Sequence, residues 1–116
     1  MSQHEPLVAL RHMLDYAREA VDLARGRSRA DLDVDRLLQL ALTRLVEIVG
    51  EAASRVPSEL QSRHPALPWR EAVGARNRLI HGYDFVDHDI LWEIVATDLP
   101  RLIPQIEEAL KLEAPE

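Results

Sequence analysis

Side chains that can move protons and bind phosphate gather in one eight-residue stretch of this 116-residue chain, Arg76-Asn-Arg-Leu-Ile-His81-Gly-Tyr83. Histidine can take up or release a proton near neutral pH because its unperturbed pKa is about 6.5. Arginine binds phosphate through its planar fork and stabilises negative charge that develops on it. An arginine followed five residues later by a histidine is expected roughly 0.6 times in a shuffled chain of this composition. Requiring one of the two tyrosines two positions further on lowers that expectation to about 0.01.

A structural explanation of this stretch stays open, because arginines in a last helical turn complement the helix dipole and His81 before Gly82 could cap carbonyl groups. As a site, the same residue types suit metal-free cleavage of RNA, in which the ribose 2′-OH attacks the adjacent phosphate. That reaction needs a base, an acid and a cation. One His81 cannot lie on both sides of the in-line path. Two chains related by a twofold axis would bring two His81 and two Arg76 into one cleft.

The elements that would position this stretch are predicted to be helices throughout. A first helix is expected from about 6 to 24, because Pro6 suits a first turn and Gly26 a stop. Its apolar residues recur at steps of three and four, which is typical of one helical face: Leu7, Leu10, Leu14, Ala17, Val21 and Ala24. A solvated loop is expected at 25–29.

A second helix, capped by Asp31 or Asp33, is expected to follow that loop. Its apolar residues cover more than one side, which is typical of a central helix or of one that faces a second chain: Val34, Leu37, Leu38, Leu40, Ala41, Leu42, Leu45, Val46, Ile48, Val49, Ala52 and Val56. Gly50 lies inside this helix, where it costs about 1 kcal/mol relative to alanine. It is either a tolerated glycine or the point of a close helix crossing, and both interpretations stay open.

The middle of the chain predicts a short helical turn around 58–62 and a third helix at about 69–80. Trp69 follows a proline, and the simplest role for a tryptophan there is a core anchor. Gly82 is placed to be the C′ residue of the third helix. The third helix would thus carry Arg76 and end next to His81.

The last part of the chain predicts two further helices. A fourth is expected to begin among Asp84, Asp87 and Asp89, which can cap its first turn. Pro100 should break its hydrogen-bond ladder and start a fifth helix, which Pro104 would kink or delay. No strand pattern or internal repeat is present. The predicted class is therefore all-α, a bundle of four or five helices.

Length and composition place these helices in a single domain, residues 1–116, with a core at about 7–112. The chain is 47% hydrophobic and has no cysteine, so a disulfide, a thiol nucleophile and a cysteine zinc site are excluded. No apolar run reaches the roughly 18 residues of a membrane span, and the opening Met1–Pro6 lacks a signal-peptide pattern. We therefore expect a cytoplasmic protein that does not contact membranes.

The formal charge of −6 argues against a protein that coats nucleic acid, but the charge is uneven. From Arg63 to Tyr83 there are four arginines and one acid, a sum of +3. From Asp84 to the end there are nine acids and two bases, a sum of −7. This distribution favours a protein that grips a few phosphates in a small cleft.

Other polar clusters are weaker candidates. The acids at 84–89 are better explained as helix caps than as a metal site, and no metal or cofactor is expected. His64 before a proline is expected to be structural, with a place in an RNA groove as the alternative. Three further histidines are expected at the surface: His4, His12 and His88. Trp92 is expected in the core or in a dimer contact.

The pattern Arg76-Asn77-(x)3-His81-x-Tyr83 resembles the R-x4-H-x-Y signature of HEPN-domain proteins, specifically the HepT-like toxins of type VII toxin–antitoxin pairs. The resemblance covers roughly residues 7 to 110. Further landmarks occur in the family's order: Ile48-Val-Gly-Glu-Ala52, His64-Pro-Ala-Leu-Pro-Trp69, Leu91-Trp-Glu-Ile-Val95 and Asp98-Leu-Pro100.

This resemblance implies an antiparallel HEPN-type bundle that forms a homodimer, with a metal-independent endoribonuclease cleft at the interface. Arg76 and His81 would be the catalytic pair acting on RNA, with Asn77 and Arg78 in supporting positions. Tyr83 would match the tyrosine that a minimal nucleotidyltransferase antitoxin modifies with AMP, which silences the toxin. Two alternatives remain: a non-catalytic helical HEPN module that binds a nucleotidyltransferase or a nucleotide, and a purely structural dimeric bundle.

Overall fold

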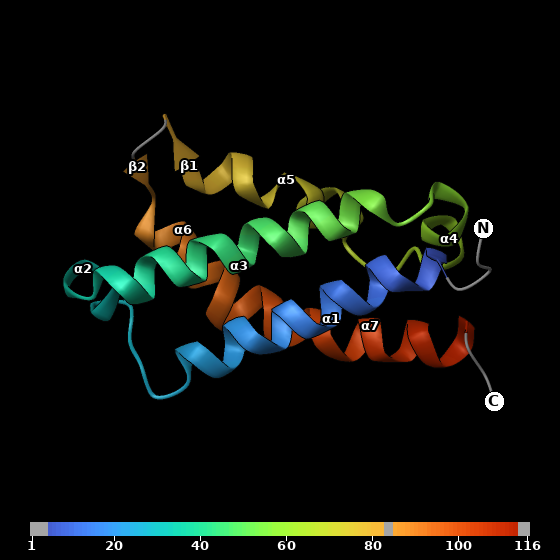
Figure 1. The fold of residues 1–116 in the computed structure, drawn as a ribbon, viewed down its shortest axis with the longest axis horizontal. Coiled ribbons are helices and arrows are strands. Elements are labelled where there is room, and N and C mark those ends of the chain that lie inside the picture. Colours follow the sequence, from blue (N-terminus) through green and yellow to red (C-terminus); the bar gives the residue numbers. More distant parts are fainter. Residues whose placement is uncertain (1–4, 83–84, 114–116) are drawn as a thin grey trace.

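The computed structural model describes residues 5–82 and 85–113, and its helices form an elongated bundle (Figure 1). The long helices are α1 (Glu5–Ala24), α3 (Arg36–Arg55), α5 (Trp69–Leu79) and α7 (Leu99–Glu113), and the short ones are α2 (Asp31–Val34), α4 (Ser58–Arg63) and α6 (His88–Glu93). A π-helical segment, η1 (Ile94–Asp98), joins α6 to α7. Two short strands, β1 (Ile80–His81) and β2 (Phe85–Val86), form a hairpin. The predicted all-α class is confirmed.

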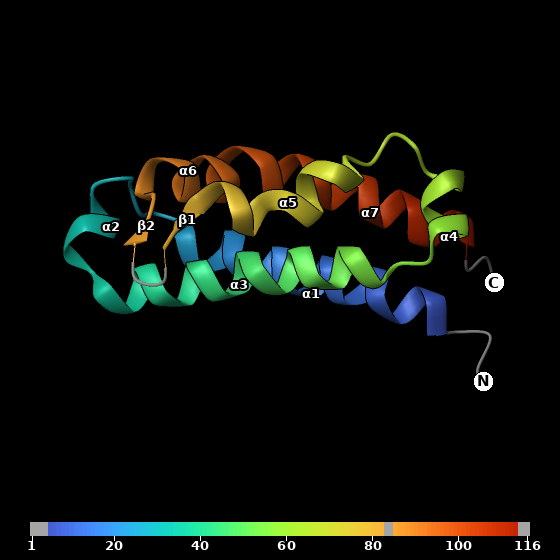
Figure 2. The ribbon, with the colours of Figure 1, turned by 90° about the horizontal axis from the view of Figure 1, so that it is seen from above.

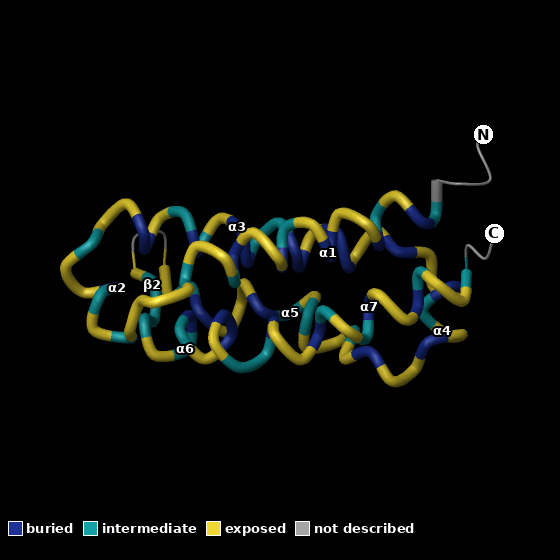
Figure 3. The backbone as a smooth tube through the Cα atoms, turned by 90° about the horizontal axis from the view of Figure 1, so that it is seen from below, coloured by how far each residue is buried: buried dark blue, intermediate teal, exposed yellow. Residues whose placement is uncertain are grey.

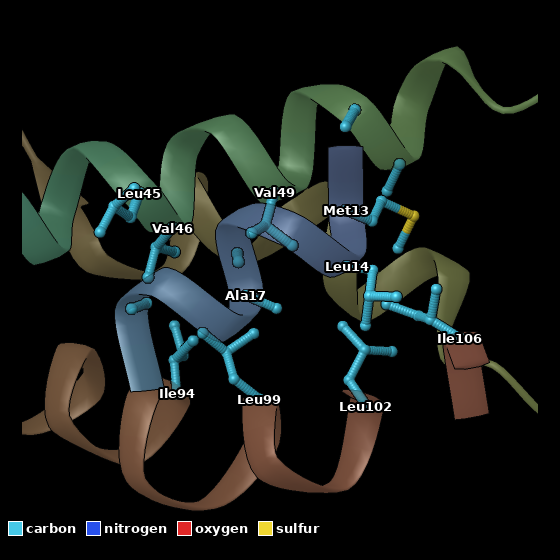
Figure 4. Close-up of a cluster of buried hydrophobic side chains, with 14 of the residues drawn as sticks. Met13, Leu14, Ala17, Leu45, Val46, Val49, Ile94, Leu99, Leu102 and Ile106 are labelled. Atoms are coloured by element: carbon cyan, nitrogen blue, oxygen red, sulfur yellow. The ribbon is translucent and has the colours of Figure 1, made fainter. Parts of the chain in front are cut away.

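The core lies where α1 packs against both α3 and α7. In Figure 4, Met13 and Ala17 of α1 lie between Val49 of α3 and Leu102 and Ile106 of α7. Met13, Ala17 and Ile106 are fully buried. Each large apolar side chain buried in this way contributes about 1.5–3 kcal/mol. Figure 3 shows the same pattern along the bundle, with buried turns toward neighbouring helices and exposed turns outside.

The second predicted helix is divided in two. Asp35 has an extended backbone (φ −116°, ψ 93°), and its carboxylate accepts a hydrogen bond from the Leu38 N–H at 3.0 Å. That hydrogen bond and the Arg27 guanidinium lower the pKa of Asp35. The prediction of Asp31 or Asp33 as the cap of the long helix is therefore wrong, because Asp35 takes that position.

The predicted fifth helix corresponds to α7, and the regular hydrogen-bond ladder is interrupted before Pro100 as predicted, but the chain stays helical through η1 and no loop separates α6 from α7. In η1 the helix widens, and the Leu99 N–H bonds to the carbonyl of Ile94, five residues earlier. Such a wider turn makes room for the proline ring, which in a regular helix would collide with the carbonyl four residues back. Pro104 lies inside α7, where it cannot donate a hydrogen bond to Pro100.

The expectation that no strand forms is also wrong, because β1 and β2 pair antiparallel directly after α5. The C-cap of α5 is Ile80, in an extended conformation, and not a left-handed glycine. Gly82 does have a positive φ of 79°, but it follows β1 in the hairpin. Two-residue strands are too short to show an alternating pattern in the sequence.

Gly50 marks a close crossing of α3 and α5, one of the two interpretations left open by the sequence. A Cβ built at Gly50 would lie 2.9 Å from the carbonyl oxygen of Ala72, a backbone atom that cannot rotate away. The two helices run antiparallel and side by side (Figures 1 and 2). This crossing fixes the register of α5, the helix that carries Arg76.

Candidate active site

Arg76 lies in the last turn of α5 and faces α3. Its Nε–H donates a hydrogen bond to Oε2 of Glu47 at 2.9 Å. The Arg76 side chain is 58% exposed, whereas that of Glu47 is 20% exposed. Both line a groove of about 470 Å³ between α3 and α5, whose rim also includes Arg44, Val73 and Asn77. The guanidinium is therefore anchored at one edge and open to solvent at the other.

His81 lies on β1, where the hairpin turns the chain back toward α6. Its ring faces Phe85, the partner residue on β2, with ring centroids 5.8 Å apart. Nε2 of His81 is 3.9 Å from Oδ2 of Asp87, which suits an ion pair when the ring is protonated. The other carboxylate oxygen of Asp87 accepts from the Ile90 N–H at 3.1 Å and caps α6. The helix cap thus fixes the carboxylate that faces the histidine, and the predicted capping role of Asp87 is confirmed.

The predicted supporting residues lie on different sides of α5. Asn77 is exposed and lines the same groove as Arg76. Arg78 instead faces η1, where its Nη2 lies 3.8 Å from Oδ2 of Asp98. Arg78 lines a separate groove of about 820 Å³ between α3, α5 and α7. Tyr83, the predicted modification site, lies outside the described residues.

Most of the positive charge predicted for residues 63–83 is paired with acids from other segments. Arg63 binds Glu113 through two hydrogen bonds of 3.0 and 2.9 Å. Arg76 pairs with Glu47, and Arg78 with Asp98. The stretch therefore does not form a broad basic surface, and the cationic character of the site comes from the open edge of Arg76.

Two of the other histidines in the described part of the chain make polar contacts, whereas His12 is exposed on α1, as predicted. His64 is buried, and its Nε2 lies 2.7 Å from Oε2 of Glu113, so its predicted structural role is confirmed. His88, expected at the surface, is partly exposed, and its Nδ1 lies 2.9 Å from Oδ1 of Asp33. Hydrogen bonds from His88 and Arg29 lower the pKa of Asp33. This contact ties α6 to α2, next to the hairpin that carries His81.

Two carboxylates that contact predicted site residues were not themselves predicted: Glu47 beside Arg76 and Asp87 beside His81. Glu47 is 29 residues from Arg76 in sequence, so only the register of α3 against α5 brings the two together. One feature of the sequence indicates Glu47 as a neighbour of the crossing helix: it precedes Gly50 by three residues and therefore lies on the same face of α3.

The structure thus gives two neighbouring pairs, Arg76 with Glu47 and His81 with Asp87, and His81 does not line the groove that holds Arg76. Within the ranges that the structure describes, no cluster of three or more metal-ligating side chains occurs. None of the described helices combines the length and the apolar character that crossing a membrane would need.

Comparison with known proteins identifies the family. Residues 13–109 match the model of the HepT-like ribonuclease family. A protein of Caldanaerobacter subterraneus subsp. tengcongensis, named a putative RNase, is 35% identical over 108 residues, which cover 93% of this chain and 96% of the relative. A putative RNase of Methanocaldococcus jannaschii is 30% identical over 107 residues, which cover 92% and 98%.

A third relative, named a probable ribonuclease HepT, comes from Thermococcus cleftensis. It is 36% identical over 102 residues, which cover 84% of this chain and 93% of the relative. No solved structure matches the chain significantly. The family model spans most of the chain, and two of these relatives exceed 30% identity over nearly their full length. The chain therefore belongs to the HepT-like ribonuclease family.

Proposed function

We propose that this protein is a metal-independent endoribonuclease toxin that acts in the cytoplasm and cleaves RNA in a cleft between two copies of the chain. Arg76 and His81 are the catalytic pair. The observation that carries the proposal is that both side chains are more than half exposed, at 58% and 55%, while each lies beside a fixed carboxylate. Both side chains are therefore accessible to a ligand while one side of each is held by an acid.

In the proposed reaction, the ribose 2′-OH attacks the adjacent phosphorus and forms a 2′,3′-cyclic phosphate. One His81 takes the proton from the 2′-oxygen, and the partner copy's histidine donates a proton to the departing 5′-oxygen. The bond between phosphorus and the 5′-oxygen breaks, which leaves a 5′-hydroxyl end. The Arg76 guanidinium stabilises the extra negative charge on the phosphate oxygens in the transition state.

An exposed apolar stripe on α3 supports the proposed homodimer. Leu37 and Leu40 are 79% and 47% exposed, and Val34 just before α3 is 83% exposed. Leu37, Leu40, Arg44 and Glu47 follow one another at steps of three and four residues, so they share one face of α3. The apolar stripe thus leads directly to the carboxylate that holds Arg76. An isologous interface along this face would place the two arginines near the twofold axis.

We further propose that a minimal nucleotidyltransferase antitoxin silences the toxin by attaching AMP to Tyr83. The support is the sequence position of Tyr83, two residues after His81, together with the open edge of Arg76. A nucleotide phosphate attached next to the catalytic histidine would repel RNA and could pair with that guanidinium. The expected mark is a gain of one or more AMP masses on Tyr83 after expression with the antitoxin.

The test is RNA cleavage by the purified, unmodified protein in the presence of EDTA. We expect wild type to cleave, and His81→Ala and Arg76→Ala to lose at least about 100-fold in rate. Matched controls are His12→Ala and Arg11→Ala, which remove the same residue types from the exposed side of α1. Full activity of folded His81→Ala would refute the mechanism, and loss of wild-type activity in EDTA would refute metal independence. A folded wild type that binds the antitoxin but leaves RNA intact would point to a non-catalytic module.

A further inference from the structure

The Arg76 guanidinium is held by a single contact from another helix. Its Nε–H bonds to Oε2 of Glu47 at 2.9 Å, the one hydrogen bond of this side chain to any residue that the structure describes. Arginine has five N–H donors in a rigid plane, so four remain on the terminal nitrogens. Among the residues that the structure describes, these terminal N–H groups have no hydrogen-bond partner, and the Arg76 side chain lines the groove between α3 and α5.

Glu47 is itself held from a second side. Nη1 of Arg44 lies 3.6 Å from Oε1 of Glu47, the oxygen that does not bind Arg76. The Arg44 side chain is 64% exposed and that of Glu47 only 20%. The carboxylate is therefore a largely covered group between two cations, and its orientation is restricted before any ligand arrives.

The crossing of α3 and α5 sets the separation of Glu47 from Arg76. The helices come closest where Gly50 faces the carbonyl oxygen of Ala72. The helices α3 and α5 run antiparallel (Figure 1). Glu47, one turn before Gly50 on α3, therefore lies beside Arg76, one turn after Ala72 on α5. Gly50 thus acts as a spacer that lets the carboxylate reach the guanidinium.

We propose that Glu47 is a positioning residue that holds the Arg76 guanidinium in the orientation needed to bind the scissile phosphate. This proposal rests on the function proposed above and adds a residue to the site that no motif position identifies. A free arginine side chain explores many rotamers and is seldom in the productive one. The contact from Glu47 restricts Arg76 to an orientation that presents its terminal N–H groups to an oxyanion. This orientation would stabilise the transition state more than the bound substrate, because the negative charge on the phosphate oxygens is greatest in the transition state.

The kinetic test compares wild type with Glu47→Ala and Glu47→Gln. Alanine removes the acceptor, and we expect kcat to fall about 10- to 100-fold with KM changed less than about 3-fold. Glutamine keeps a neutral Oε1 acceptor of the same size, so it should restore kcat to within about 5-fold of wild type. Glu107→Ala is the control, because it breaks a different cross-helix pair with arginine, Arg18–Glu107, between α1 and α7.

An NMR test reports on the same contact without activity. The Nε–H signal of Arg76, assigned by its loss in Arg76→Lys, should exchange slowly with water in wild type and quickly in Glu47→Ala. Equal exchange in the two proteins would overturn the proposal. A folded Glu47→Ala variant with wild-type kcat would also overturn the proposal. A raised kcat would overturn it too, because it would mean that the carboxylate competes with phosphate for the arginine.

Failure of the two proposals can be told apart. If wild type does not cleave RNA, the proposed function fails, and the exchange measurement alone decides whether Glu47 holds Arg76. If wild type cleaves and Glu47→Ala cleaves equally well, only the positioning role fails. Glutamine as defective as alanine would also overturn it, because a neutral acceptor of equal reach should hold the Nε–H group.

Discussion

Replacing Gly50 by alanine should destabilise the fold, whereas the same change at Gly74 should stabilise it. Both glycines lie inside helices, α3 and α5, and neither has a positive φ. An alanine in a helix interior is favoured over glycine by about 1 kcal/mol. The two substitutions therefore share the same gain in helix propensity and differ only in what the added methyl group meets.

The structure predicts the size of that difference. A Cβ at Gly74 meets nothing within 4 Å, but one at Gly50 would lie 2.9 Å from the Ala72 carbonyl oxygen. To restore an ordinary contact of about 3.4 Å, α5 must move away by about 0.5 Å, and overpacking of this kind costs about 1–3 kcal/mol. Gly74→Ala should thus raise the free energy of unfolding by about 0.5–1 kcal/mol. Gly50→Ala should change it by about 0 to −2 kcal/mol.

The assay is urea denaturation followed by far-UV circular dichroism, with all proteins at one protomer concentration because dimerisation would make stability depend on it. The decisive quantity is the difference in the free energy of unfolding between the two variants, expected at about 1–3 kcal/mol. If Gly50→Ala stabilises the protein as much as Gly74→Ala does, then α5 does not press on α3 at this point. The register argument for Glu47 and Arg76 would then lose its basis.

Two further perturbations test the C-terminal contact and the dimer face. Hydrogen bonds from Arg63 and His64 hold the pKa of Glu113 at about 2, below its ordinary 4.5 and against the effect of desolvation. A lowered carboxyl pKa stabilises the fold above pH 4.5, and this contribution is lost as the pH falls toward 2. Glu113→Gln should therefore lower the free energy of unfolding by about 1–2 kcal/mol at pH 7, allowing for screening at the surface. The variant should also lose less stability than wild type as the pH falls, which urea titrations from pH 7 downward would measure. Leu37→Asp should convert the proposed dimer into a monomer, as measured by sedimentation velocity, and abolish RNA cleavage. Leu112→Asp, at an exposed position on α7, should do neither. A monomeric wild type that still cleaves RNA would refute the proposed cleft between two copies.

Helix positions could be predicted from the sequence because they depend on local patterns. The steps of three and four residues from Leu7 to Ala24 predict the first helix within one residue of its observed start, and the short helical turn expected around 58–62 corresponds to α4. These signals act over a few residues, so no knowledge of the tertiary fold is needed to use them.

Choices between local alternatives could not be predicted in the same way. Asp31, Asp33 and Asp35 are equally suitable caps by residue type. Asp35 prevails in the structure, where Arg27 binds its carboxylate from the preceding loop. The hairpin of β1 and β2 is too short to carry a periodic signal, and its placement after α5 turns His81 toward Asp87.

The site shows why a local sum of charges misjudges binding. Residues 63–83 add up to +3, but the structure pairs Arg63, Arg76 and Arg78 with acids from α7, α3 and η1. Long polyanions bind mainly through unpaired cations spread over a surface, and these pairs reduce that attraction. A guanidinium with one edge fixed and one edge open still offers strong donors to a single phosphate whose charge rises during the reaction. In the proposed mechanism, Arg76 would therefore stabilise the transition state more than it stabilises bound RNA in general, which is how an interaction raises kcat.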